Sequence, residues 1–308
     1  MRLCNAILRK IKFMDVLQLV AKYNTQAACI KHLEKVRWSG GVVCPYCQSM
    51  KNKSVSKENR YKCYSCKRSF SVLIGTLFEA TKLPLQKWFF AIALIIDAKK
   101  GISSLQLSRH LKVNKDTAWY LQRRIRNGMK DGDILNGIVE IDETYVGGSM
   151  EKMSTKIKKQ KNYYPGGMQH KTPVLGMAQR EGKLKLKVLH KAWGREIKPI
   201  LKNEIAKESI IVTDGFGGYS QMDLHFEKHV VLNHEKKIYA NGIFNMSKIE
   251  GFWAMLKRAI IGTYHQISNK YLQEYLDEIA FKFNYKNGKM KFNILINNLL
   301  LSTIPLSG

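Results

Sequence analysis

Three acidic residues stand in the C-terminal half of the sequence at positions where their side chains could meet. Asp142 lies in the apolar stretch ILNGIVEIDETYVGG (134–148), Asp214 in ESIIVTDGFGGYS (208–220), and Glu250 follows Asp214 by 36 positions. The two apolar stretches predict strands that end near glycine turns, where carboxylates are accessible. Carboxylate oxygens suit Mg²⁺ or Mn²⁺, and a pair of such ions can support phosphoryl transfer. Taken singly, each acid also fits an ordinary turn or solvated helix position.

Glu250 belongs to a predicted amphipathic helix. Its apolar neighbours recur at helical spacing, at Ile249, Phe252, Trp253, Leu256 and Ile260. Lys257 lies seven residues after Glu250, close to two turns, so both point the same way. Trp253 lies on the apolar face, which favours packing over base stacking.

Four cysteines form two C-x-x-C pairs, Cys44 with Cys47 and Cys63 with Cys66, with fifteen residues between the pairs. This spacing is typical of a zinc ribbon, in which two knuckles complete a tetrahedron of thiolates around Zn²⁺. Four protein ligands leave no open position, so the predicted zinc is structural. Paired cysteines of this kind also fit a reducing compartment rather than a disulfide framework.

The charge of the chain points to a polyanionic partner. The 308 residues carry 52 Lys and Arg against 24 Asp and Glu, a net charge of +28. Residues 1–130 alone hold 26 basic and 6 acidic residues. Nucleic acid is the first partner to consider and an anionic membrane surface the second. No apolar run approaches the length of a membrane span, and no signal peptide is expected. We therefore expect an intracellular protein with access to DNA, in a bacterial cytoplasm or a nucleus.

A helix-turn-helix is predicted over residues 102–128, with its turn at LKVN. The core positions expected there are Leu105, Leu111, Ala118, Leu121 and Ile125. The basic residues expected to face outward, toward DNA, are Lys115, Arg123, Arg124 and Arg126. Asn114 or Asp116 can cap the second helix.

The rest of the chain predicts a mixed α and β arrangement. Residues 83–99 form a predicted helix, and strands are expected over 134–146, 173–180, 184–190 and 209–213, with a helix at 196–207. From residue 247 onward the pattern is mostly helical. The basic stretch 151–171, with Lys158 and Lys159, is either a solvated loop or a DNA clamp.

Together IDETYVGG, TDGFGGY and IEGFWAMLKRAIIGTYH resemble the insertion-sequence transposases of the DDE type that carry an N-terminal zinc ribbon. The resemblance covers roughly residues 30–290. It implies an RNase H-like domain with a mixed sheet, Asp142 on the first strand, Asp214 on the fourth and Glu250 on a later helix. It also implies that Lys257, with Arg258 beside it, contacts DNA phosphate.

One element departs from the family pattern. Where such transposases carry His-x-Asn, this chain has Asn245-Met246-Ser247. Serine is a poorer metal ligand than asparagine, which favours Glu250 as the third ligand of Mg²⁺ or Mn²⁺.

We therefore expect a multidomain α+β protein. The expected parts are N-terminal helices (1–39), a zinc ribbon (40–78), a helical helix-turn-helix segment (79–130), an RNase H-like α/β catalytic domain (131–290) and a C-terminal tail (291–308). The expected function is cleavage of double-stranded DNA at the terminal repeats of a mobile element, followed by joining to target DNA. Two ends must be held together, so a homodimer or larger assembly is expected. The alternatives are a decayed or domesticated transposase that only binds DNA, and a nuclease without strand transfer.

Overall fold

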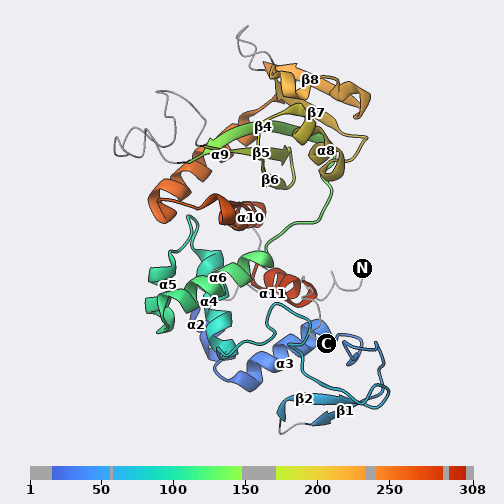
Figure 1. Ribbon diagram of the computed structural model, residues 1–308, viewed down its shortest axis with the longest axis vertical. Coiled ribbons are helices and arrows are strands. Elements are labelled where there is room, and N and C mark those ends of the chain that lie inside the picture. The colour runs from blue at the N-terminus through green and yellow to red at the C-terminus, as the bar shows by residue number, and fades with distance from the viewer. Residues whose placement is uncertain (1–15, 56–57, 148–170, 233–239, 287–290, 303–308) are drawn as a thin grey trace. The chain divides into compact units, whose positions relative to one another are not determined.

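The computed structural model describes residues 16–55, 58–147, 171–232, 240–286 and 291–302 of the chain. These residues fall into two compact units. Unit 1 combines Met1–Lys130 with Tyr285–Gly308, and unit 2 is Asp131–Asn284 (Figure 1). No helix among the described ranges is long and apolar enough to cross a membrane.

Unit 1 is built mainly from helices and also contains a small sheet. The helices are α2 (Val16–Lys22), α3 (Gln26–Arg37), α4 (Leu85–Asp97), α5 (Ser104–Leu111), α6 (Lys115–Asn127) and α11 (Lys291–Leu301). The strands are β1 (Asn52–Val55), β2 (Arg60–Cys63) and β3 (Ser69–Phe70), paired antiparallel in that order. Trp38, Tyr61 and Phe70 pack together beneath this sheet.

The predicted helix-turn-helix is present in unit 1. Helices α5 and α6 pack on each other and on α4. Asn114 caps α6, because its Oδ1 accepts the Thr117 N–H at 2.7 Å. One predicted core position was wrong: Leu105 is half exposed, and Leu107 fills the core instead.

The C-terminal segment differs from the expected tail. Residues Lys291–Leu301 form helix α11, which packs against α3 and α4. A Cβ added to Gly128, after the end of α6, would lie 2.6 Å from the Leu299 side chain. Helix α11 therefore contributes to the core of unit 1.

Unit 2 contains a five-stranded mixed sheet in the order β6-β5-β4-β7-β8 (Figure 1). Its strands are β4 (Ile138–Val146), β5 (Thr172–Gln179), β6 (Leu184–Val188), β7 (Ile210–Asp214) and β8 (Lys228–Leu232). The pairs β4–β5 and β5–β6 are antiparallel, whereas β4–β7 and β7–β8 are parallel. This arrangement is an RNase H-like sheet, so the predicted fold class is confirmed.

Helices cover both faces of that sheet. On one face lie α9 (Ser247–Ala259) and α10 (Leu272–Asn284), and on the other lies α8 (Gly194–Glu204). A two-stranded ribbon of β9 (Ala240–Asn241) and β10 (Phe244–Asn245) precedes α9. Short helical turns are η3 (Gly217–Tyr219), η4 (Met222–Leu224), η6 (Ile260–Tyr264) and η7 (Asn269–Tyr271). The apolar stripe predicted for α9 is buried at Ile249, Phe252, Trp253 and Leu256.

Candidate catalytic and DNA-binding sites

Asp142 and Asp214 lie on two neighbouring strands, just past the stretch in which β4 and β7 pair. The parallel pairing of β4 with β7 runs from Ile138–Ile210 to Glu140–Val212. Asp142 and Asp214 each lie two residues beyond the last of these pairs. Side chains alternate along a strand, so both carboxylates share the sheet face that α9 covers.

Helix α9 adds Glu250 to this group. Burial raises the pKa of Asp142, and repulsion from the nearby Asp214 and Glu250 raises it further. The hydrogen bonds that Asp142 accepts from Trp253 and from the Glu143 backbone oppose this rise. Asp214 and Glu250 therefore both lie within electrostatic reach of Asp142. Glu250 itself is exposed on its helix, as are Lys257 and Arg258.

Trp253 contributes more than packing. Its indole Nε1–H donates a hydrogen bond to Asp142 Oδ2 at 2.8 Å, and its side chain is only 6% exposed. Gly176, which pairs with Asp142 across the strands, leaves room for the ring, because a Cβ there would lie 2.6 Å from Trp253 atoms. The helix pattern correctly predicted burial of Trp253 but carried no signal of this hydrogen bond.

A buried carboxylate anchors the start of α9. Glu140 Oε2 accepts the backbone N–H groups of Lys248 and Ile249 at 3.0 and 3.1 Å, and Oε1 accepts Arg180 Nη2 at 3.2 Å. No side chain caps α9 at Met246. Glu140 therefore takes the place of a capping residue and fixes the helix that carries Glu250 to the strand that carries Asp142.

Glu143 and Tyr219 form a polar pair on the opposite side of β4. The Tyr219 hydroxyl donates a hydrogen bond to Glu143 Oε2. Burial raises the pKa of Glu143 to about 7, and Asp214 and Asp142 add to the rise while the Tyr219 hydrogen bond opposes it. This pair was not predicted as part of the site.

The donor set fits divalent cations with oxygen ligands. Repulsion from Asp214 and Glu250 acts on Asp142, and a bound Mg²⁺ or Mn²⁺ would offset such repulsion between carboxylates. Among the described residues, only the four cysteines bring their ligand atoms within 4.8 Å of one another. The carboxylates therefore do not form a comparably tight group.

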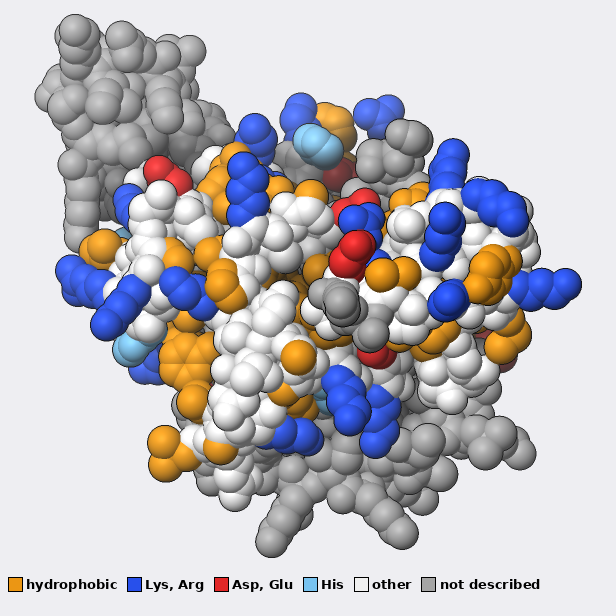
Figure 2. All heavy atoms as spheres, turned by 90° about the horizontal axis from the view of Figure 1, so that it is seen from below, with side chains coloured by type: hydrophobic (Ala, Val, Ile, Leu, Met, Phe, Trp, Pro, Cys, Tyr) orange, Lys and Arg blue, Asp and Glu red, His pale blue; other side chains and the backbone are white. Residues whose placement is uncertain are grey.

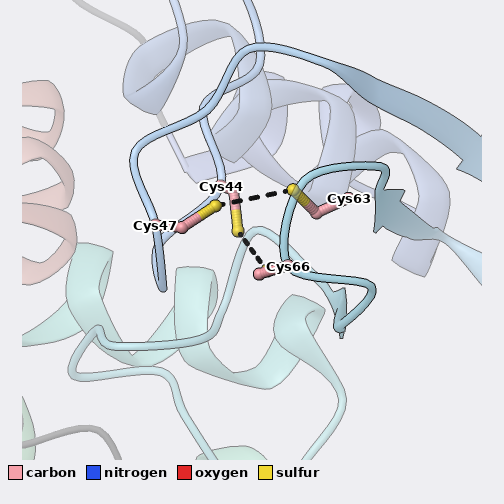
Figure 3. A group of neighbouring side chains, drawn as sticks. All are labelled: Cys44, Cys47, Cys63 and Cys66. Carbon is pink, nitrogen blue, oxygen red and sulfur yellow. Dashed lines mark hydrogen bonds between the residues drawn. The ribbon is translucent and has the colours of Figure 1, made fainter.

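The four cysteines form a compact metal-binding cluster (Figure 3). Their side chains point toward one another from the two C-x-x-C turns, with Sγ–Sγ distances of 3.7 Å for Cys44–Cys66 and 3.6 Å for Cys47–Cys63. A tetrahedron with Zn–S bonds of about 2.3 Å requires edges of about 3.8 Å. The thiol positions therefore fit one zinc ion.

The predicted DNA-contacting residues of α6 divide into two groups. Lys115 is exposed at the start of the helix. Arg126 is only 1% exposed, so its prediction as an outward-facing residue was wrong. Arg124 is half-buried, donates to the Glu79 carbonyl at 2.7 Å and lies over the Trp88 ring, which gives it a structural role. Arg123 is partly exposed and lies over Trp119.

Lys and Arg side chains are spread over the face that Figure 2 shows, with some Asp and Glu among them. Lys158 and Lys159, in the predicted basic insertion, lie outside the described residues.

The sequence matches place these sites in a family. Residues 134–284 match the ISXO2-like transposase domain, and residues 24–69 match the transposase zinc-ribbon domain. Together the two matches cover well over half of the chain. The chain therefore belongs to the zinc-ribbon insertion-sequence transposases with a DDE-type domain.

The names of two curated relatives also refer to transposable elements or transposases. The chain is 27% identical to a protein of Halobacterium salinarum described as an uncharacterized protein in transposable element ISH50, over 79% of this chain and 86% of that protein. It is 30% identical to an uncharacterized transposase-like protein of Haemophilus influenzae, over 32% of this chain and 77% of that protein.

Solved structures with a distant likeness are those of Mos1 transposase. A paired-end complex with the left transposon end matches at 13% identity and a TM-score of 0.27, over 68% of this chain and 78% of that chain. The Mos1 mariner paired-end complex with Mn matches at 14% identity and a TM-score of 0.28, over 68% and 74%. The family assignment rests on the sequence matches alone.

Proposed function

We propose that this chain cleaves double-stranded DNA at the terminal repeats of a mobile element and joins the freed 3′-hydroxyl to target DNA. The proposal is supported by the nearness of Asp214 and Glu250 to Asp142, because repulsion from both raises the pKa of Asp142. The pairing of β4 with β7, the strands that carry Asp142 and Asp214, also supports it.

In this proposal the three carboxylates hold two Mg²⁺ or Mn²⁺ ions. When bound, such ions activate a water or hydroxyl nucleophile and stabilise the leaving oxygen. Trp253 keeps Asp142 oriented through its N–H group, and Glu140 keeps α9 in place. Lys257 and Arg258, exposed on α9 about two turns after Glu250, are suited to hold the DNA phosphates beside the acids.

We assign DNA end binding to unit 1. The cysteine cluster would hold structural Zn²⁺, and the exposed Lys115 at the start of α6 would contact DNA backbone. The partly exposed Arg123 lies on the same helix. Pairing of two element ends requires a dimer or larger assembly in the active complex.

The test is a cleavage and joining assay on a short duplex that carries the element's terminal repeat and flanking DNA. Mg²⁺ or Mn²⁺ is added or omitted, and a pre-cut duplex is offered separately. We expect metal-dependent nicking with wild-type protein, and joined product from the pre-cut end. Asp142→Asn, Asp214→Asn and Glu250→Gln should abolish both reactions and leave duplex binding intact.

Glu181→Gln serves as the matched control, because Glu181 is an exposed carboxylate of the same unit. Duplex binding without cleavage in either metal would instead identify a DNA-binding protein that has lost its chemistry. Cleavage without joining of the pre-cut end would identify a nuclease.

A further inference from the structure

A basic and aromatic cluster lies at the start of α8, outside the group of acids. It consists of His190, Lys191, Trp193 and Arg195, and together with Glu196 these residues line a hollow of about 520 Å³. Trp193 is 53% exposed, and Lys191 Nζ lies 4.4 Å from its ring centroid. Small-ligand pockets in proteins have volumes of this order.

Among the described residues that line this hollow, the only carboxylate is that of Glu196, and it forms hydrogen bonds within the cluster. Glu196 accepts the backbone N–H groups of His190 and Lys191 at 2.9 and 3.0 Å, and its Oε1 lies 3.2 Å from His190 Nδ1. These contacts hold the segment before α8 onto the first turn of the helix. The Glu196 carboxylate is thus occupied by hydrogen bonds within the cluster, which hold the backbone that carries Lys191 in place.

The cluster is structurally tied to the loop that follows Asp214. A Cβ added to Gly194 would lie 2.8 Å from the Gly218 carbonyl oxygen, so the start of α8 and the η3 turn are in close contact. The Phe216 N–H donates to Asp214 Oδ1 at 3.0 Å. The short loop 215–218 therefore contacts both the start of α8 and Asp214.

We propose that this cluster binds an unpaired nucleotide of the DNA substrate close to the cleaved phosphate. An exposed indole ring stacks on a base of any sequence, and flanking cations take the phosphates on either side. A duplex would not offer a free base face, so the cluster selects single-stranded DNA. This inference rests on the proposed function, because it assigns the cluster to the same substrate.

The test uses the full-length protein and a single-stranded oligo-dT of about 12 nucleotides, the length that a stacking groove spans. One thymine is replaced by 5-iodouracil, which crosslinks to a stacked aromatic ring on illumination. We expect the adduct on the peptide that contains Trp193. A crosslink found only on other peptides would overturn the proposal.

Affinity measurements complete the test and include matched variants. Trp193→Ala should weaken oligo-dT binding about tenfold, whereas Trp193→Phe retains a stacking ring and most of the affinity. Lys191→Gln should weaken oligo-dT binding more than Lys202→Gln, because Lys202 is an exposed lysine at the far end of the same helix. Blunt duplex binding should be unchanged in Trp193→Ala.

An equal loss of duplex and oligo-dT binding in Trp193→Ala would also overturn the proposal, since it would show general electrostatic attraction instead. These assays are run without added divalent cations. Failure of the cleavage chemistry would therefore leave a Trp193 crosslink intact, and the two proposals fail separately.

Discussion

Trp253 donates its indole N–H to Asp142 Oδ2 at 2.8 Å, across the interface between helix α9 and strand β4. The ring is buried against the sheet, where Gly176 leaves space for it. A packing residue thus also fixes the orientation of the central acid. The hydrogen bond links the position of α9, and hence of Glu250, to the position of Asp142.

Trp253→Phe removes this hydrogen bond and keeps an aromatic ring in the core. A hydrogen bond to a charged group contributes about 1.5–3 kcal/mol, so we expect cleavage to fall about tenfold or more. The concentration of Mn²⁺ needed for half-maximal cleavage should rise at the same time. Gly176→Ala should have a similar effect, because its Cβ would displace the Trp253 ring. Unchanged cleavage and metal dependence in both variants would exclude a positioning role.

The sequence predicted the elements of unit 2 well because their signals are local. The strands around Asp142 and Asp214 and the apolar stripe of α9 follow from periodicity within each segment. The role of Glu140 could not be predicted in this way. Its partners are backbone N–H groups more than 100 positions away, at Lys248 and Ile249, and backbone groups carry no residue-type signal.

Arg126 was predicted to be exposed, but it is buried. Its charge suggested an outward position, although it follows the buried Ile125 directly and is itself buried. Helix α11 returns from the C-terminus to pack beside Gly128, near the end of α6. Nothing within residues 102–128 indicates that a distant helix covers this end, so the extent of the exposed face could not be read locally.

Arg126→Leu should therefore affect stability, and Lys115→Gln should affect DNA binding. The loss of Arg126 should lower the free energy of unfolding, because its side chain is only 1% exposed and the shorter leucine would leave space in the packing. Lys115→Gln should leave thermal stability unchanged, weaken duplex binding and reduce the slope of log affinity against log salt by about 1. Thermal melts and salt titrations measure these effects. If the Arg126→Leu protein were as stable as wild type but bound duplex DNA more weakly, the prediction would be wrong and Arg126 would be assigned to DNA binding.

The cysteine cluster should hold one zinc ion per chain, as measured by elemental analysis of the purified full-length protein. Cys44→Ser should lose that zinc and unfold the ribbon, since a structural zinc site and its small fold form together. Cys29→Ala is the control, because Cys29 lies in α3 outside the cluster and is buried there. Full zinc content in Cys44→Ser would contradict the assignment.

Glu143 should make the stability of unit 2 depend on pH. Its folded pKa of about 7 lies above its ordinary value of 4.5, mainly because it is buried. The unfolded chain therefore releases this proton first, and the free energy of unfolding falls as pH rises from 4.5 to 7. Glu143→Gln removes this contribution and keeps an oxygen that accepts the Tyr219 hydrogen bond. We expect this variant to melt at a higher temperature than wild type at pH 8 in buffer without divalent cations.

The free energy of unfolding of Glu143→Gln should depend less on pH than that of wild type. Some dependence should remain, because the pKa of Asp142 is also raised. Glu181→Gln, at an exposed position, should follow the wild-type curve. Parallel curves for Glu143→Gln and wild type would contradict the prediction.

Glu140→Gln tests whether the anchor of α9 also positions the acids proposed to be catalytic. The change leaves Arg180 without its buried ionic partner and removes a negative charge from the start of the helix. Breaking such a pair costs about 3 kcal/mol, which urea unfolding would measure. At a temperature where the variant is still folded, cleavage should fall while duplex binding through Lys115 persists, because only the alignment of Glu250 with Asp142 is disturbed. A variant that is destabilised but cleaves like wild type would show that Glu140 supports the fold alone, and that Trp253 is sufficient to align the two acids.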